Sequence, residues 1–122
     1  MHDTEEDWLP ISGYEGSYQV SSLGGVRSLS RHVDRLGRDG NIHLIWRNGA
    51  VLTPKKRGAY LGIQLRIRGS RKLHSIHRLV ACAFCTKGSG HTEVNHLNED
   101  KHDNRAGNLA WCTRSENQSH SK

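Results

Sequence analysis

Apolar and polar residues alternate along much of the first 76 positions, and this pattern predicts short antiparallel strands. The clearest alternation covers residues 60–68, where apolar and polar side chains fall on opposite faces. The apolar face consists of Leu61, Ile63, Leu65 and Ile67. Gly69-Ser70 predicts a turn, and residues 71–76 predict the returning strand. Weaker alternation predicts a hairpin at residues 18–21 and 26–31.

The segment between these hairpins has less regular patterning. Residues 32–41 contain arginines and two glycines, and we interpret them as a polar loop. Residues 42–47 are strand-like, and Asn48-Gly49 follows them. Because both residues tolerate positive φ angles, this pair predicts a hairpin turn that leads into a returning strand at residues 51–54.

Hydrophobic spacing changes to a helical period after residue 76. Leu79 and Ala83 lie four positions apart, as do Val80 and Phe84, so we expect a helix over residues 77–84. Short strands are predicted at residues 92–96 and 108–112, with a polar loop between them. Thr113 followed by Glu116 is the capping-box pattern of a helix start. The predicted fold class is α+β, with a small N-terminal antiparallel β-sheet region, a helix, and a strand–loop–strand–helix unit.

Charge is distributed unevenly along the 122 residues. Lys and Arg total 18 against 12 acidic residues, and residues 26–90 hold 14 basic side chains but only two acidic ones, Asp34 and Asp39. Such a basic segment suits a nucleic-acid backbone, although a solvated surface is the alternative. The candidate DNA-binding residues are Arg27, Arg31, Lys55, Lys56, Arg57, Arg66, Arg68, Arg71 and Lys72.

Length and composition favour one compact domain that is soluble and intracellular. The acidic N-terminus lacks the apolar run of a signal peptide, and no stretch approaches the roughly 20 apolar residues of a membrane span. Cys82, Cys85 and Cys112 make an odd cysteine count, which indicates a reducing compartment. Structural Zn²⁺ bound by these cysteines with His91 or His120 is a less favoured alternative, since the sequence lacks a second Cys-x-x-Cys.

The strongest chemical pattern surrounds His96. Asn95 precedes it directly, Asn108 follows at +12 and Asn117 at +21, and we expect all four side chains to converge. A neutral imidazole can take a proton from water at neutral pH, and the side-chain carbonyl of Asn108 is the candidate acceptor that orients its ring. The amide oxygens of Asn95 and Asn117 are candidate ligands of a hard divalent ion such as Mg²⁺ or Mn²⁺.

These residues resemble a known nuclease family. Val94-Asn95-His96, Asp103-Asn104, residues 108–113 and Glu116-Asn117 are similar to the ββα-metal motif of HNH homing endonucleases of the phage type. His77-Arg78-Leu79-Val80-Ala81 is also typical of them. Residues 8–21, with Gly13-Tyr14-Glu15-Gly16 at their centre, resemble the NUMOD4 module that precedes such nucleases.

The resemblance implies a metal-dependent DNA endonuclease that hydrolyses phosphodiesters and nicks one strand per active site. His96 matches the general base, Asn108 the residue that orients it, and Asn95 and Asn117 the metal ligands. The expected division is a NUMOD4-like segment at 1–31, a basic β region at 32–73 and the nuclease motif at 74–122. We expect a monomer that acts on double-stranded DNA, is phage-encoded and works in the bacterial cytoplasm. The alternative is a non-catalytic DNA-binding module.

Asn95, Asn98-Glu99 and Asp103 depart from the family pattern, and Asp103 stands where the first residue of the usual Asn-Asn pair does. Some members carry Asp where Asn95 stands, and a neutral amide binds a cation more weakly than a carboxylate. Asn98-Glu99 replaces the usual Asp-Gly, which changes the turn that follows His96.

Overall fold

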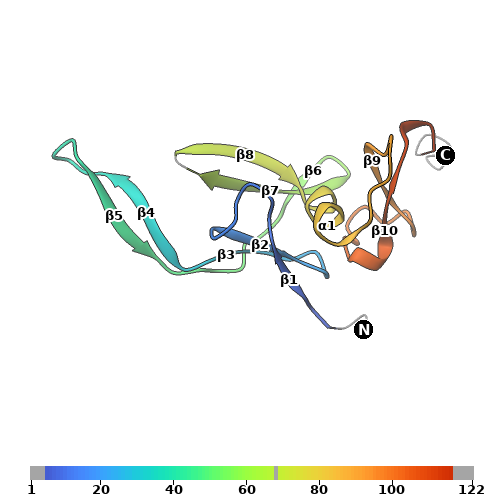
Figure 1. The fold of residues 1–122 in the computed structure, drawn as a ribbon, viewed down its shortest axis with the longest axis horizontal. Helices are drawn as coiled ribbons and strands as arrows, with labels where there is room; N and C mark the ends of the chain where they lie inside the picture. The colour runs from blue at the N-terminus through green and yellow to red at the C-terminus, as the bar shows by residue number, and fades with distance from the viewer. Residues whose placement is uncertain (1–4, 68, 117–122) are drawn as a thin grey trace.

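The computed structural model describes residues 5–67 and 69–116, and it has the predicted α+β architecture with strands dominating (Figure 1). The N-terminal antiparallel sheet consists of β1 (Trp8–Pro10), β2 (Tyr18–Ser21) and β3 (Val26–Ser28). A two-stranded ribbon follows, built from β4 (Arg31–Leu36) and β5 (Ile42–Arg47). The second three-stranded sheet consists of β6 (Lys55–Arg57), β7 (Tyr60–Ile67) and β8 (Ser70–Ser75).

The β7–β8 hairpin confirms the strongest strand prediction. Leu65 is fully buried and Ile63 nearly so, whereas the alternate residues Gln64 and Arg66 are exposed. Ile67 shares the apolar face but is 39% exposed, because this end of the hairpin extends past the core. Alternation therefore identifies the buried face of β7.

The ribbon corrects two predictions. Residues 31–36, most of which the sequence analysis assigned to a polar loop, form β4 and pair with β5 in a register that joins Leu36 to Ile42. Asn48-Gly49 is not the hairpin turn, and neither residue has a positive φ. The chain instead reverses at residues 37–41, where Gly40 has φ 81°. The turn was missed because its glycines lie within a polar segment that has little apolar alternation.

The segment after β5 pairs with β3 rather than with β5. The Ser28 N–H donates to the Ala50 carbonyl at 2.8 Å, and the Leu52 N–H donates to the Val26 carbonyl at 2.9 Å. The ribbon is thus a continuation of the N-terminal sheet that projects away from the body of the protein (Figure 1).

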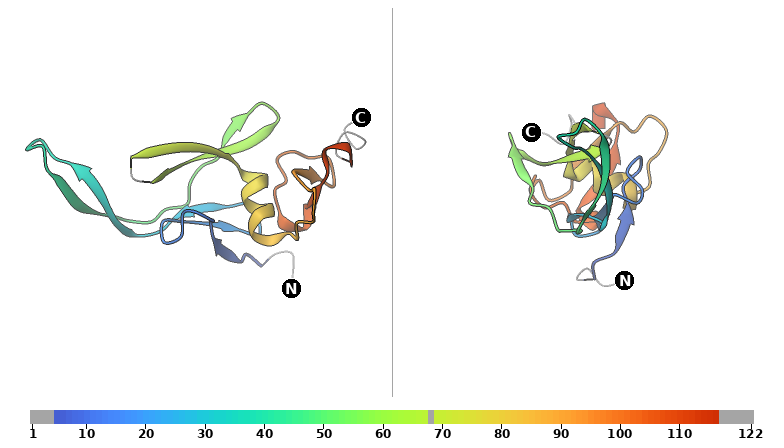
Figure 2. Two further views of the ribbon diagram at one scale, coloured as in Figure 1. Left: turned by 45° about the horizontal axis from the view of Figure 1, so that its top comes forward. Right: turned by 90° about the vertical axis from the view of Figure 1, so that its left-hand side faces the viewer.

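The helix α1 (Ile76–Phe84) lies at the centre of the fold, which confirms the predicted helix and places its start one residue earlier, at Ile76. The structure then continues through β9 (Glu93–His96), a 3-10 turn η1 (Ala106–Asn108) and β10 (Leu109–Cys112). Figure 2 shows α1 between the N-terminal strands and the β9–β10 hairpin. One core joins these parts, because Val20 of β2, Val80 of α1 and Trp111 of β10 belong to the same buried cluster.

The capping box at the end of β10 is confirmed. The Glu116 N–H donates to Thr113 Oγ1 at 3.1 Å, and the Thr113 N–H donates to Glu116 Oε1 at 2.8 Å. Helical backbone begins at Arg114, as the sequence indicates. The division at residues 31 and 73 stays a prediction, since the core is shared across both boundaries. Among the described helices, none is long and apolar enough to cross a membrane.

Candidate functional site

His96 ends strand β9, and its side chain faces the core. The residue is 2% exposed and pairs with Leu109 of β10 in the hairpin register. Burial alternates along β9, with Val94 and His96 inside and Glu93 and Asn95 less buried. The imidazole is therefore held by surrounding protein on most sides.

Asn104 is the hydrogen-bond partner of the His96 ring. Its Oδ1 lies 2.8 Å from His96 Nε2, and the Asn104 residue is 4% exposed. Because a carbonyl oxygen only accepts, Nε2 carries the proton and the lone pair of a neutral ring is on Nδ1. Among the described residues, Nδ1 has no partner and is not sealed from solvent, so it is the nitrogen that can accept a proton.

Asn108 does not orient the His96 ring, which corrects the role that the sequence analysis gave it. Its Oδ1 accepts the Asn98 N–H at 3.1 Å, and its Nδ2 donates to the Asn98 side chain and to the Asp103 carbonyl. These bonds clamp the loop between β9 and η1 across its base. Asn108 therefore acts on the loop that carries Asn104, and its side-chain carbonyl bonds to the Asn98 backbone rather than to the His96 ring.

Asn95 and His96 leave β9 on opposite faces, because successive residues of a strand alternate. Asn95 is partly exposed, and its side-chain amide makes no hydrogen bond within the described chain. An amide oxygen without a hydrogen-bond partner is a suitable ligand for a hard divalent ion. The described residues therefore supply one candidate metal ligand, the side chain of Asn95. The second candidate, Asn117, lies outside the described residues, and the predicted convergence of four side chains is not tested.

Aromatic rings pack against His96 from two other elements. The His77 ring of α1 lies 5.1 Å from the His96 ring, and the Tyr60 ring of β7 lies 4.8 Å from His77 and 6.0 Å from His96. His77 Nδ1 is buried without a partner among the described residues. Burial, and then the nearby His96, Arg78 and Lys101, lower the pKa of His77 from 6.5 to about 4. Neither His77 nor Tyr60 was assigned a site role from the sequence.

The loop after β9 is ordered by its own polar side chains. Arg105 donates to both carboxylate oxygens of Asp103 at 2.8 Å, and this contact is the main cause that lowers the pKa of Asp103 to about 2. Asn98 Nδ2 donates to the same carboxylate at 2.9 Å. Glu99 has φ 63°, so it adopts the left-handed conformation that Gly would favour at this position of the family pattern.

The basic residues of β6–β8 divide between two faces of the sheet. Arg66 and Arg71 lie opposite each other in the register and share the exposed face with Gln64. Lys55 and Arg57 belong to this face as well. They pair with Gly62 and Tyr60, which alternate with Gln64 and Arg66 on the same side of β7. We call Lys55, Arg57, Gln64, Arg66 and Arg71 the basic face.

Lys72, a candidate DNA-binding residue from the sequence, does not belong to the basic face. It pairs with the buried Leu65, and Lys56 pairs with Leu61, so both lysines lie on the core side of the sheet. Both lysines remain exposed because the core does not reach these positions. Alternation within β8 alone does not predict which of its residues share a face with Arg66. That depends on the register in which β8 pairs with β7 after the turn. Arg68 lies outside the described residues.

Arg27 and Arg31 make contacts within the N-terminal region. Arg27 donates to Gln19 Oε1 at 2.6 and 2.9 Å and stacks over the Trp8 ring. Arg31 lies over the Tyr18 ring and donates to the Leu29 carbonyl. Arg27 is thus held by its neighbours, whereas Arg31 also lines a cleft.

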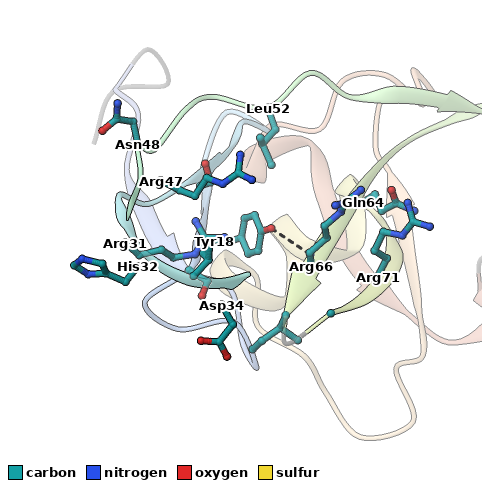
Figure 3. A pocket seen from close by; sticks show the side chains of 15 residues that line it. Tyr18, Arg31, His32, Asp34, Arg47, Asn48, Leu52, Gln64, Arg66 and Arg71 are labelled. Atoms are coloured by element: carbon teal, nitrogen blue, oxygen red, sulfur yellow. Dashed lines mark hydrogen bonds between the residues drawn. The ribbon is translucent and has the colours of Figure 1, made fainter. Parts of the chain in front are cut away.

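This cleft, of about 720 Å³, lies between the β4–β5 ribbon and the β7–β8 hairpin. Figure 3 shows Arg31 and Arg47 on one side, Arg66 and Arg71 on the other, and Tyr18 between them. The Tyr18 hydroxyl accepts the Arg66 N–H at 3.2 Å, which ties the two sheets together. Four arginines and one aspartate line the cleft, so it favours anions. Arg47 was missed because the pairing of β4 with β5 was not predicted.

The cysteines have separate surroundings. Cys82 is exposed, whereas the Cys85 thiol donates to the Ala106 and Leu109 carbonyls at 3.6 Å. Burial raises the pKa of the Cys85 and Cys112 thiols. In residues 5–67 and 69–116, no cluster of three or more His, Cys, Asp or Glu side chains is arranged to hold a metal ion.

The low pKa of His77 predicts a specific pH dependence of stability. As pH falls, the unfolded chain protonates His77 near 6.5, but the folded chain does so only near 4. Stability contributed by the neutral ring is therefore present above pH 6.5 and is lost as pH falls from 6.5 to 4. Urea unfolding across this range measures the loss, and His77→Phe, which keeps a ring, should reduce it. Equal pH slopes for the two proteins would contradict the assignment.

Two family models match the chain in sequence. The NUMOD4 motif matches residues 6–66, and the HNH endonuclease model matches residues 75–119. HNH nucleases generally use a divalent metal, but these matches do not identify which metal.

Curated relatives agree with the family models. The chain is 34% identical over 115 residues to the uncharacterized HNH endonuclease L247 of Acanthamoeba polyphaga mimivirus, covering 92% of this chain and 24% of that protein. It is 32% identical over 108 residues to the DNA endonuclease I-HmuI of Bacillus phage SP01, covering 88% of this chain and 52% of that protein. The chain thus spans between about a quarter and about half of these relatives.

A solved structure gives the same result for the fold. The structure described as DNA binding and cleavage by the HNH homing endonuclease I-HmuI superimposes with a TM-score of 0.63 at 30% identity. The match covers 93% of this chain and 56% of that one. With an N-terminal NUMOD4 motif and a following HNH module, the chain belongs to the HNH homing endonuclease family.

Proposed function

We propose that the protein is a metal-dependent DNA endonuclease that hydrolyses one phosphodiester bond per active site and so nicks DNA. The observation that carries the proposal is the state of His96. Its Nε2 is tied to Asn104, and its Nδ1 has no partner within the described chain. A neutral ring fixed in this way suits general-base catalysis. The homing endonuclease resemblance and the related phage enzyme support DNA as the substrate.

In the proposed reaction, His96 Nδ1 takes a proton from a water molecule as the water oxygen attacks the phosphorus. A new P–O bond forms to the water oxygen, and the bond from phosphorus to the departing sugar oxygen breaks. The departing oxygen takes a proton from solvent. Asn104 holds Nε2–H throughout, so the ring does not rotate away from the water when it becomes charged.

The proposed metal ligand within the described chain is Asn95, joined by Asn117 as a prediction from the sequence. A bound divalent ion, Mg²⁺ or Mn²⁺, would stabilise negative charge on the phosphate and the leaving oxygen. Because an amide is neutral, we expect this chain to bind the ion weakly without DNA, whose phosphate oxygens supply further ligands.

The basic face and the arginine-lined cleft are the proposed path of the DNA backbone. Arg66 and Arg71 belong to both, and Arg31 and Arg47 face them across the cleft. Phosphate contacts of this type set position and affinity rather than sequence preference. That the protein acts as a monomer stays a prediction.

His96→Ala tests the proposed chemistry. Conversion of supercoiled plasmid to open circles in Mg²⁺ or Mn²⁺ measures nicking, and the variant should be about 10² to 10⁴-fold slower, the usual contribution of a general base. Excess EDTA should abolish nicking by the wild-type protein. His102→Ala is the matched control, because His102 is an exposed histidine of the loop that follows His96.

An unchanged rate in His96→Ala, or full activity in EDTA, would refute the mechanism. Salt-sensitive DNA binding without cleavage in any divalent metal would instead identify a non-catalytic DNA-binding module.

Arg66→Gln with Arg71→Gln tests the DNA path. Loss of two phosphate contacts should weaken binding about tenfold and reduce the salt dependence, the slope of log K against log salt, by about 2. Binding is measured in EDTA over a series of salt concentrations so that cleavage does not interfere.

Lys72→Gln is the control, because Lys72 is exposed on the same strand as Arg71 but lies on the opposite face of the sheet. We expect a change of slope well below that of the arginine pair. Equal effects of the control and of the pair would show that the charge of this hairpin acts without regard to face.

A further inference from the structure

The His96 ring depends on Asn104, and Asn104 lies against the N-terminal sheet. Position 24 is the point of contact, in the turn between β2 and β3. A Cβ atom built on Gly24 would lie 3.1 Å from Asn104 Cβ and 3.3 Å from the Asn104 carbonyl oxygen. The absence of a side chain at Gly24 therefore allows the loop to approach this closely.

A second contact holds the loop two residues further along. The Ala106 N–H donates to the Ser22 carbonyl at 2.7 Å. The turn thus contacts the loop both at Asn104 and at Ala106. Ser22 and Gly24 belong to the NUMOD4 match, whereas Asn104 and Ala106 belong to the HNH match.

The turn itself is firmly held. Ser21 is fully buried, and its Oγ accepts the N–H groups of Leu23 and Gly25 at 3.3 and 2.8 Å. The Gly24 N–H donates to the Ser21 carbonyl at 3.1 Å, and Gly24 has φ 92°. These three bonds are made within the turn, so they hold its shape without help from the loop that rests on it.

We propose that the β2–β3 turn of the NUMOD4 motif is a positioning element of the nuclease centre, which acts through Asn104 on the His96 ring. The N-terminal motif then contributes to the chemical step as well as to any DNA contact. The inference rests on the proposed nuclease function. Its chain of contacts runs from the Gly24 backbone to Asn104 and on to His96 Nε2.

Gly24→Ala tests the proposal, with Gly16→Ala as a matched control. Both glycines have positive φ, 92° and 82°, so both variants carry the same backbone strain. A Cβ at Gly16 meets nothing within 4 Å, whereas one at Gly24 meets Asn104. Only the first variant should displace the loop.

We expect Gly24→Ala to lower kcat for plasmid nicking about tenfold, because the loop must shift by a few tenths of an ångström and a misplacement of about 1 Å costs about 100-fold. Its KM for DNA, and its DNA affinity in EDTA, should stay within about threefold of wild type. Gly16→Ala should keep kcat within about threefold. Equal kcat for the two variants, or a fall of Gly24→Ala in DNA affinity rather than kcat, would overturn the proposal.

Ala106→Pro alters the contact between the turn and the loop from the loop side. It is the replacement test if Gly24→Ala does not fold. It removes the N–H that reaches Ser22. Proline is tolerated at the first position of a helical turn, and Arg105 has φ −65° and ψ 140°, which suit a residue before proline. The same loss of kcat with unchanged DNA affinity is expected, and wild-type kcat would overturn the proposal.

A double variant tests the route through Asn104. Asn104→Ala should itself lower kcat about 100-fold, and adding Gly24→Ala should lower it no further, because the side chain that the turn positions is gone. Multiplied effects in the double variant would show that the turn acts by another route.

If the wild-type protein binds DNA but does not cut it, the proposed nuclease function is refuted. The positioning inference is then tested by a second measurement that needs no cleavage. Solvent exchange of the His96 Nε2 proton, followed by NMR, should be slow in wild type and Gly16→Ala and faster in Gly24→Ala. Equal exchange in all three proteins would overturn the inference regardless of cleavage.

Discussion

The hydrogen bond between His96 Nε2 and Asn104 Oδ1 decides what the candidate site can do. It sets the proton on Nε2 and leaves Nδ1 to accept one, and it does so in a ring that is 2% exposed. The other features of the site hold one of the two partners of this bond in place. Asn108 clamps the loop that carries Asn104, the Tyr60 and His77 rings pack on the imidazole, and the β2–β3 turn supports the loop from behind.

A single small core explains why two sequence motifs act as one structure. Helix α1 lies between the N-terminal strands and the β9–β10 hairpin, and Trp111 Nε1 donates to the Ala81 carbonyl from the hairpin side. Val20, Leu65 and Val80 bury fully in the same cluster. Outside this core, the ribbon and the end of β7–β8 project with little apolar support, and their facing arginines form the cleft that favours anions.

Local signals carried much of the sequence prediction. Alternation identified β7, helical spacing identified α1, and Thr113 with Glu116 identified the capping box, because each feature depends on residues a few positions apart. The β4–β5 ribbon and the hydrogen-bond partner of His96 depend instead on how residues further apart in the sequence pair. The chain reverses at Gly37–Asn41 rather than at Asn48-Gly49, and Asn104 rather than Asn108 reaches the ring, because register and loop path decide these contacts. The face of the sheet on which Lys72 lies depends on the register of the β7–β8 hairpin in the same way.

The tautomer of His96 tests the account most directly. Two-bond and three-bond ¹⁵N–¹H correlations of the histidine rings at neutral pH, with His96 assigned by its loss in His96→Gln, distinguish a proton on Nε2 from one on Nδ1. The structure predicts the tautomer with the proton on Nε2 and the lone pair on Nδ1. A ring protonated on Nδ1 alone, or one that averages freely between the two tautomers, would contradict the role of Asn104 and the assignment of Nδ1 as the base.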